Sequence, residues 1–299
     1  MSISKKHAGV MLLIALAATS VGLNACKTTT GAVNKTTEAA ARVLLPPSEE
    51  VKLGAQLSAE TEKELTIHAD ADVQKYISAL GQKVAAAAKG RTPDGITFTF
   101  KVVDDPATVN AFAMPGGYIY IYSGLLLKAE SEAEVIGVLG HEVAHVTQRH
   151  VAERLVAAYG LQTVTDMAIG KNPGQLSQIA AGLAANGYLL KYGRDQERES
   201  DRVGLSYVLR AGYNPQGMVS FFEKLAAGGP RPPVILSSHP DPADRAEELQ
   251  KLIAKQSSVP KKTGEEEFEA MYPKFKSPAA TTPPAEPAPE TTTDAETTK

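Results

Sequence analysis

The hydrophobic and polar positions of the chain repeat at helical spacing over most of its length. Apolar residues recur every three or four positions over six stretches, 48–65, 72–88, 131–158, 194–211, 214–225 and 243–254. Two shorter stretches, 96–103 and 118–122, alternate residue by residue in the manner of strands. Several helices around a small sheet predict an α+β fold.

The N-terminal end departs from this pattern. Lys5 and Lys6 precede an uncharged apolar run over residues 8–23, which is typical of a secretory signal peptide over residues 1–25. The run is shorter than the ~20 residues of a spanning helix. The only cysteine, Cys26, follows directly, in an arrangement that resembles the lipobox of bacterial lipoproteins and implies a lipid attached to Cys26. We expect residues 26–45 to form a tether.

The C-terminal residues 276–299 consist almost entirely of Pro, Ala, Thr and Glu, so we expect a disordered tail. This leaves 46–275 as one compact domain. The 299 residues are 43% apolar and 22% charged, which argues against a wholly disordered or polytopic membrane protein. A net charge of −3 gives no basic excess and so predicts no nucleic-acid partner, and a single cysteine excludes an internal disulfide.

The motif His-Glu-Val-Ala-His begins at His141 and ends at His145, inside an expected helix. At ~100° per residue the two side chains lie about 40° apart on one face, so both imidazoles can reach one ion at ~2.0–2.1 Å. Glu142 flanks that face and can take a proton from a zinc-activated water. Gly137 and Gly140 leave room for another segment to approach. The motif therefore predicts a zinc-dependent hydrolase with Glu142 as general base.

A third metal ligand is expected from the acidic helix at 194–211. Glu197 and Asp201 are four residues apart and share a face. Glu197 can complete a His-His-Glu site, and Asp201 can accept the outer N–H of a ligating histidine. Glu199 is the second choice of ligand, and a plain solvated charged helix is the alternative to both.

His150 lies about 180° from His141 if the helix runs on to residue 158. The third histidine of a metzincin motif does not follow His145 either. We therefore predict that His150 is a structural or surface residue and not a ligand.

Four segments together resemble one family of zinc metallopeptidases. They are HEVAHVTQRH at 141–150, ERESD at 197–201, which has the pattern E-x-x-x-D, NAFAMPGG at 110–117 and SHPDPADR at 238–245. This family includes the HtpX proteases and the CAAX prenyl endopeptidases, and the similarity is greatest to its periplasmic BepA/LoiP-like branch, over most of 46–255. It implies a mainly helical zincin-type (gluzincin-like) domain with a small β-sheet beside the active-site helix.

The resemblance also implies residue roles. It assigns zinc to the two motif histidines and Glu197, and it implies that His239 faces the metal, where it steadies an oxyanion or caps the ion. Arg245 is a possible brace of the same loop. Residues 110–122 would form an edge strand that binds an extended substrate, although an ordinary strand and turn explain them equally well. The residues concerned are Asn110, Gly116, Gly117 and Tyr118.

Two departures from the family pattern stand out. Ser200 occupies a position that is usually Ala, and the chain shows neither a tetratricopeptide array nor the multiple membrane spans of HtpX.

We expect a zinc metalloendopeptidase that acts on unfolded or misassembled cell-envelope proteins, lipid-anchored in the periplasm with the outer membrane favoured. The alternatives are a chaperone-like lipoprotein whose zinc site His239 holds closed, and a structural lipoprotein without metal.

The apolar stretch 157–190 is interrupted by glycines. It allows three interpretations: a mobile lid over the cleft, a membrane-facing segment, or part of the core. We favour helices that partly gate the site.

Overall fold

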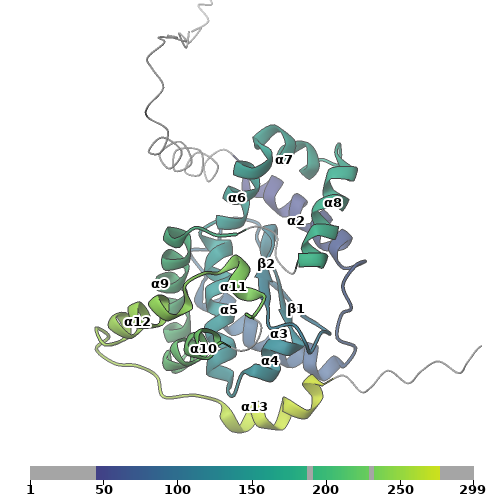
Figure 1. Ribbon diagram of the computed structural model, residues 1–299. Helices are drawn as coiled ribbons and strands as arrows, with labels where there is room; N and C mark the ends of the chain where they lie inside the picture. The colour runs from purple at the N-terminus through teal and green to yellow at the C-terminus, as the bar shows by residue number, and fades with distance from the viewer. Residues whose placement is uncertain (1–44, 187–190, 229–231, 277–299) are drawn as a thin grey trace, which may run out of the picture.

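The computed structural model describes residues 45–186, 191–228 and 232–276 (Figure 1). The predicted signal peptide, Cys26 and nearly all of the tether and tail lie outside these ranges. The N-terminal half contains α2 (Pro47–Thr61), α3 (Ala71–Ala87), β1 (Thr99–Val103), β2 (Ala111–Ala113), η1 (Pro115–Gly117), β3 (Tyr118–Tyr122), α4 (Ser123–Lys128) and α5 (Glu132–Thr147). It is followed by α6 (His150–Tyr159), α7 (Leu161–Ala168), α8 (Pro173–Asn186), α9 (Arg194–Arg210), α10 (Gln216–Ala226), α11 (Ile235–Ser238), α12 (Pro242–Ile253), α13 (Glu265–Met271) and η2 (Tyr272–Phe275).

The mainly helical α+β class is confirmed, with a three-stranded sheet in the order β1-β3-β2. β1 pairs parallel to β3 with Thr99 opposite Tyr118, and β2 pairs antiparallel to β3 with Ala111 opposite Ile121. Strand β2 is only three residues long and lies in the segment 110–122, for which the resemblance implied an edge strand. That expectation is wrong for β3, which lies in the same segment but is the central strand, paired on both sides. Strand β2 is the edge strand that packs against α5, so the sheet lies beside the motif helix, as the resemblance implied.

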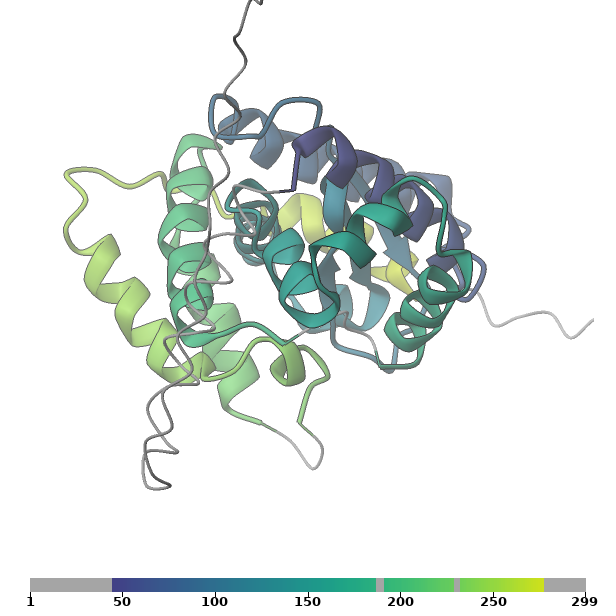
Figure 2. The same ribbon diagram turned by 90° about the horizontal axis from the view of Figure 1, so that it is seen from above.

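Helix α5 occupies the centre of the fold and is buried along its whole length. α9 and α10 pack against it, and α12 packs against α10 and α9. Figure 2 shows α9 and α12 on one side of α5 and α2 with α7 and α8 on the other. The apolar positions that predicted these helices therefore form one continuous core.

The predicted helix 131–158 is wrong in one respect, because the structure divides it. α5 ends at Thr147, and α6 begins at His150. Between them Arg149 has a φ of 61°, a left-handed conformation that ends a helix. Its side chain explains this geometry, because it donates to Glu50 Oε2 at 2.8 Å and to the carbonyl of Leu45 at 2.5 Å. These contacts turn α6 away from the axis of α5.

The stretch 157–190 forms helices, of which α7 and α8 pack against α2. Val164, Met167 and Leu183 are buried there, and Gln56 of α2 donates to the carbonyl of Ala168 at 2.7 Å. This part of the stretch is therefore core, whereas the gating role stays a prediction and residues 187–190 lie outside the described ranges. Within the described residues, no helix combines the length and apolar character needed to cross a membrane.

Candidate metal centre

Four side chains from three parts of the chain meet in the interior. α5 contributes His141 and His145, α9 contributes Glu197, and the residue after α11 contributes His239. All four are buried, and one ligand atom from each lies within 4.8 Å of the others. The structure thus brings together both motif histidines, the predicted carboxylate and the histidine implied by resemblance.

The spacing of these atoms fits a metal ion. Ligands ~2.05 Å from a tetrahedral zinc lie about 3.3 Å from one another. His141 Nε2 lies 2.9 Å from His145 Nε2 and 3.2 Å from His239 Nδ1. The Glu197 carboxylate lies 3.4 Å from His145 Nε2, 3.6 Å from His141 Nε2 and 3.0 Å from His239 Nδ1. The three nitrogens and the carboxylate therefore match a four-ligand site, with His239 in the fourth position.

Two glycines set the distance between the helices that carry these ligands. A Cβ on Gly204 of α9 would lie 2.8 Å from the carbonyl oxygen of Gly140 of α5, so the two main chains touch. A Cβ on Gly137 would likewise meet the backbone of Met218 in α10 at 2.8 Å. The expectation that Gly137 and Gly140 admit neighbouring segments is confirmed, and one of those segments is the helix of Glu197.

Asp201 and Arg245 lie directly behind the cluster. Asp201 Oδ1 lies 2.9 Å from His141 Nδ1, the nitrogen that faces away from the other ligands. Arg245 donates to both oxygens of Asp201 at 2.7 Å, and its Nη1 lies 2.5 Å from Glu197 Oε2. The guanidinium also stacks over Phe222, 4.3 Å from the ring centroid. Arg245 therefore joins α12, which follows the His239 loop, to the ligand helix.

These contacts decide the charge of the ligands. Burial by itself would raise the pKa of Glu197, but the neighbouring His239 and Arg245 outweigh it and hold the pKa well below its usual range. Burial, followed by repulsion from His141, lowers the pKa of His145 well below its usual value. The site thus holds an ionised carboxylate and a neutral imidazole, the protonation states that bind a metal.

Glu142 is buried beside the cluster without a hydrogen-bond partner for either carboxylate oxygen among the described residues. His239 Nε2 lies 3.6 Å from its Oε1. A buried carboxylate without partners is costly, and such groups are found where a ligand or water supplies the missing contact. The predicted base therefore points to a place for a water beside the four ligands.

Tyr192 was not identified from the sequence. Its ring stacks on His145 with centroids 3.8 Å apart, and its backbone N–H donates to the carbonyl of Ser238, next to His239. The residue precedes α9 by two positions and belongs to none of the four motif segments. A lone aromatic residue in a loop carries no signal of this contact, because the contact depends on the fold.

His150 and Glu199 form a pair outside the four-residue cluster. His150 is fully buried, so a surface position is excluded, and it does not join the four-residue cluster. Its Nε2 lies 3.2 Å from Glu199 Oε2, and its Nδ1 lies 3.1 Å from His145 Nδ1. Glu199, the second choice of ligand, does not join the four-residue cluster.

The four residues implied in substrate binding lie on β3 and the segments before it. Asn110 is buried and accepts from the backbone N–H of Tyr122 at 3.0 Å. Gly116 and Gly117 have φ values of 75° and 95°, and a Cβ on Gly117 would lie 2.7 Å from the carbonyl of Thr97. These contacts explain both glycines by the turn and its packing. Substrate binding by this segment, including Tyr118, stays a prediction.

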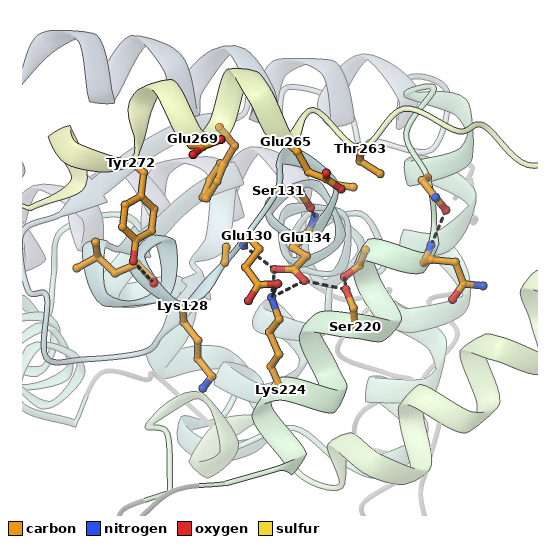
Figure 3. A pocket seen from close by; sticks show the side chains of 17 residues that line it. Lys128, Glu130, Ser131, Glu134, Ser220, Lys224, Thr263, Glu265, Glu269 and Tyr272 are labelled. Carbon is orange, nitrogen blue, oxygen red and sulfur yellow. Dashed lines mark hydrogen bonds and ion pairs between the residues drawn. The ribbon is translucent and has the colours of Figure 1, made fainter.

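A pocket of about 760 Å³ lies at the other end of α5 (Figure 3). There Glu134 accepts from Ser220 Oγ at 2.8 Å, from the backbone N–H of Glu130 at 2.8 Å and from Lys224 Nζ. Ser131 caps the helix by accepting from the Glu134 N–H at 3.3 Å. The pocket contains none of the cluster residues, and its charged groups hold the start of the motif helix in place.

The fold and the cluster define a zincin-type metallopeptidase domain, in which two histidines of an H-E-x-x-H helix and a carboxylate from a second helix meet beside a small sheet. The model of peptidase family M48 matches residues 71–253, and the chain belongs to this family. Members of this family use zinc, which agrees with the ligand cluster found here.

Named relatives cover the chain to different extents. The beta-barrel assembly-enhancing protease of Escherichia coli is 33% identical over 184 residues, 57% of this chain and 37% of that protein. Metalloprotease YcaL of Escherichia coli is 31% identical over 255 residues, 81% of this chain and 97% of that protein. The mitochondrial metalloendopeptidase OMA1 of Arabidopsis thaliana is 35% identical over 160 residues, 52% of this chain and 32% of that protein. The chain thus spans little more than a third of the beta-barrel assembly-enhancing proteases that it matches.

Proposed function

We propose that the protein is a zinc metalloendopeptidase that cleaves unfolded or misassembled proteins of the cell envelope. The observation that carries this proposal is the unpartnered, buried carboxylate of Glu142 beside four correctly spaced ligands. Family membership supports the peptidase chemistry. The envelope substrate rests on the similarity to relatives named for β-barrel assembly and on the predicted signal peptide.

The ligand roles fall to His141, His145 and Glu197, and zinc bound there supplies an activated water and polarises the scissile carbonyl. Glu142 removes the proton of the attacking water and then gives it to the leaving amine. Asp201 accepts from His141 Nδ1 and fixes the ring with Nε2 toward the ion. Arg245 keeps Asp201 and Glu197 in place.

His239 is proposed to have two positions. In the structure its Nδ1 lies within ligand distance of the other three residues, which corresponds to a closed resting site. When it moves away, the space that its ring vacates beside the other three residues would admit a water and the substrate carbonyl, and the imidazole would then donate to the oxyanion. Because the ring of Tyr192 lies 5.2 Å from the imidazole of His239, centroid to centroid, this movement also changes the contact with Tyr192.

An apolar pocket adjoins the same residues. Its walls come from α5, α10 and α11, and its members are Val138, Phe222, Leu225, Ile235 and Leu236 beside His141, Glu142 and His239. Its free volume is only about 10 Å³, and Pro242 and Arg245 complete its lining. We propose that it opens when His239 moves away and then receives an apolar side chain next to the scissile bond. Such side chains are exposed in unfolded proteins and buried in folded ones, so the pocket fits an unfolded substrate.

We further propose that the chain is held at the periplasmic face of a membrane, with the outer membrane favoured, by a lipid on Cys26. Cys26 is the only cysteine and follows the predicted signal peptide. Mass spectrometry of the mature N-terminus tests this, since a Cys26→Ser variant should lose the lipid and leave the membrane fraction.

The central test uses the purified full chain with an unfolded model protein and, separately, an unfolded outer-membrane β-barrel protein. Cleavage should stop when a chelator removes zinc and should return when zinc is added back. A chaperone-like role would instead appear as binding without cleavage at any zinc concentration. Cleavage that continues after complete removal of metal would overturn the proposal.

A further inference from the structure

Each motif histidine keeps one ring nitrogen turned away from the metal cluster. His141 Nδ1 lies 2.9 Å from Asp201 Oδ1, and His145 Nδ1 lies 3.1 Å from His150 Nδ1. A histidine that binds a metal through Nε2 carries its proton on Nδ1, and that N–H needs an acceptor to fix the ring. His141 has the usual carboxylate for this purpose, whereas His145 faces a second imidazole.

The hydrogen-bond directions follow from this arrangement. When Nδ1 of His145 donates, Nδ1 of His150 must accept, so the proton of a neutral His150 lies on Nε2. That nitrogen faces Glu199 Oε2 at 3.2 Å, which accepts it. The chain of contacts therefore runs from the metal ligand through an imidazole to a carboxylate, with Ser200 Oγ also 3.2 Å from His150 Nδ1.

We propose that His150 and Glu199 are positioning residues for the metal, which orient His145 as Asp201 orients His141. The proposal rests on the ligand set of the proposed function and extends it to two residues that do not contact the ion. Both carboxylates, Asp201 and Glu199, then come from α9, the helix that also supplies Glu197. One helix would thus provide a ligand, the partner of His141 and, through His150 of α6, the carboxylate behind His145.

The break between α5 and α6 makes this contact possible. In an uninterrupted helix His150 would point away from the motif face, about 180° from His141, but α6 begins at His150 after the left-handed turn at Arg149. α6 is also held on α9 by Gln196, which donates to Glu153 at 2.8 Å. His150 is completely buried, so its ring has little freedom to rotate.

Zinc affinity of the metal-stripped full chain, measured by competition with a chelator, tests the proposal. His150→Phe keeps a ring of similar size but has no acceptor, and we expect it to bind zinc about 10–100-fold more weakly. His150→Asn places a carbonyl oxygen near the position of Nδ1 and should recover most of the affinity. Glu199→Leu should weaken zinc binding less than His150→Phe, and Glu199→Gln, which still accepts from His150, should bind like the wild type.

Ser200→Ala is the matched control, because it removes the other contact of His150 Nδ1 and leaves the contacts of His150 with His145 and Glu199 in place, so its zinc affinity should not fall. The thermal midpoint of each metal-free variant shows whether a substitution merely destabilises the fold. Zinc binding by both His150→Phe and Glu199→Leu at wild-type affinity would overturn the proposal, as would equal losses in His150→Phe and His150→Asn. A wild-type chain that binds no zinc would instead overturn the proposed function itself.

Discussion

Helix α5 buries acidic side chains at both ends, in opposite environments. Near its start, Glu134 accepts from Ser220, Glu130 and Lys224, and Glu132 accepts from Tyr76 at 3.0 Å and from Tyr213 at 2.6 Å. Near its end, both oxygens of Glu142 lack a hydrogen-bond partner among the described residues. The first arrangement stabilises the fold, because every buried acceptor is satisfied.

The second arrangement costs stability and keeps a reactive group available. A carboxylate that is already held by several donors is a poor base, whereas one that lacks donors can bind and deprotonate a water. The comparison predicts that substitutions at the start of α5 change stability and leave the chemistry alone. Substitutions near its end should lower the rate of peptide cleavage without lowering stability.

The largest expected effect is on turnover. Glu142→Gln should lower the rate of peptide cleavage by about 10²–10⁴-fold, because the amide cannot take up a proton. Zinc content should stay at the wild-type value, and the free energy of unfolding should not fall, since the replaced oxygens make no hydrogen bond within the described residues and their burial itself costs stability. Initial rates, zinc analysis and urea unfolding of the same preparation measure all three. A variant that cleaves as fast as the wild type would show that Glu142 is not the base.

The opposite result is expected at the start of the helix. Glu134→Ala removes the acceptor of Ser220, Lys224 and the Glu130 N–H and should lower the free energy of unfolding by about 2–3 kcal/mol. Zinc affinity per folded molecule should not change. Urea unfolding of the metal-free chain measures the first quantity and chelator competition the second. A loss of zinc affinity with unchanged stability would contradict the comparison.

A smaller effect is expected where α5 touches α9. Gly204→Ala places a methyl group 2.8 Å from the carbonyl of Gly140, which should cost about 1–3 kcal/mol of stability and weaken zinc binding as the helices separate. Gly182→Ala in α8 is the matched control, because a Cβ there meets no atom within 4 Å. It should be neutral or stabilising by up to about 1 kcal/mol. Equal destabilisation by both substitutions would show that the helix contact is not what matters.

The smallest effect concerns acid stability. Burial would raise the pKa of Asp201, but Arg245 outweighs it and lowers the pKa below its usual value. The stability that Asp201 contributes is thus fully present above about pH 4 and is lost as the pH falls through the lowered pKa. For one such group the slope approaches about 1.4 kcal/mol per pH unit.

Urea unfolding of the metal-free chain between pH 5 and pH 2, values at which carboxyls titrate, measures this slope. Asp201→Asn should give a flatter profile than the wild type over that range, in addition to a lower stability at neutral pH. Parallel profiles for the two proteins would mean that Asp201 contributes no pH dependence of its own.

The sequence predicted the part of the site that depends on spacing along one helix. His141, Glu142 and His145 follow from the motif, and Glu197 with Asp201 follow from a second helical repeat, because helical geometry alone places such residues on one face. The same reasoning found α2, α3, α9, α10, α12 and the strands β1 and β3 within a few residues.

The features that were missed depend on contacts between distant segments. The break after α5 rests on Arg149, whose partners Glu50 and Leu45 lie 99 and 104 residues earlier. The contacts of His150 and Tyr192 with His145 follow from that break and from the course of the chain before α9. A three-residue strand such as β2 is too short to show a period. None of these can be derived from local patterns.

The order in which the site is assembled follows from how widely its parts are spread along the chain. His141 and His239 are 98 residues apart, and the first backbone N–H groups of α5 donate to the carbonyls of Thr263 and Gly264. During synthesis the two motif histidines therefore emerge long before the segments that complete and anchor them. A nascent chain therefore has no complete active site until its last third has folded. The fold itself delays proteolysis, so an unfinished chain cannot cleave itself or its neighbours.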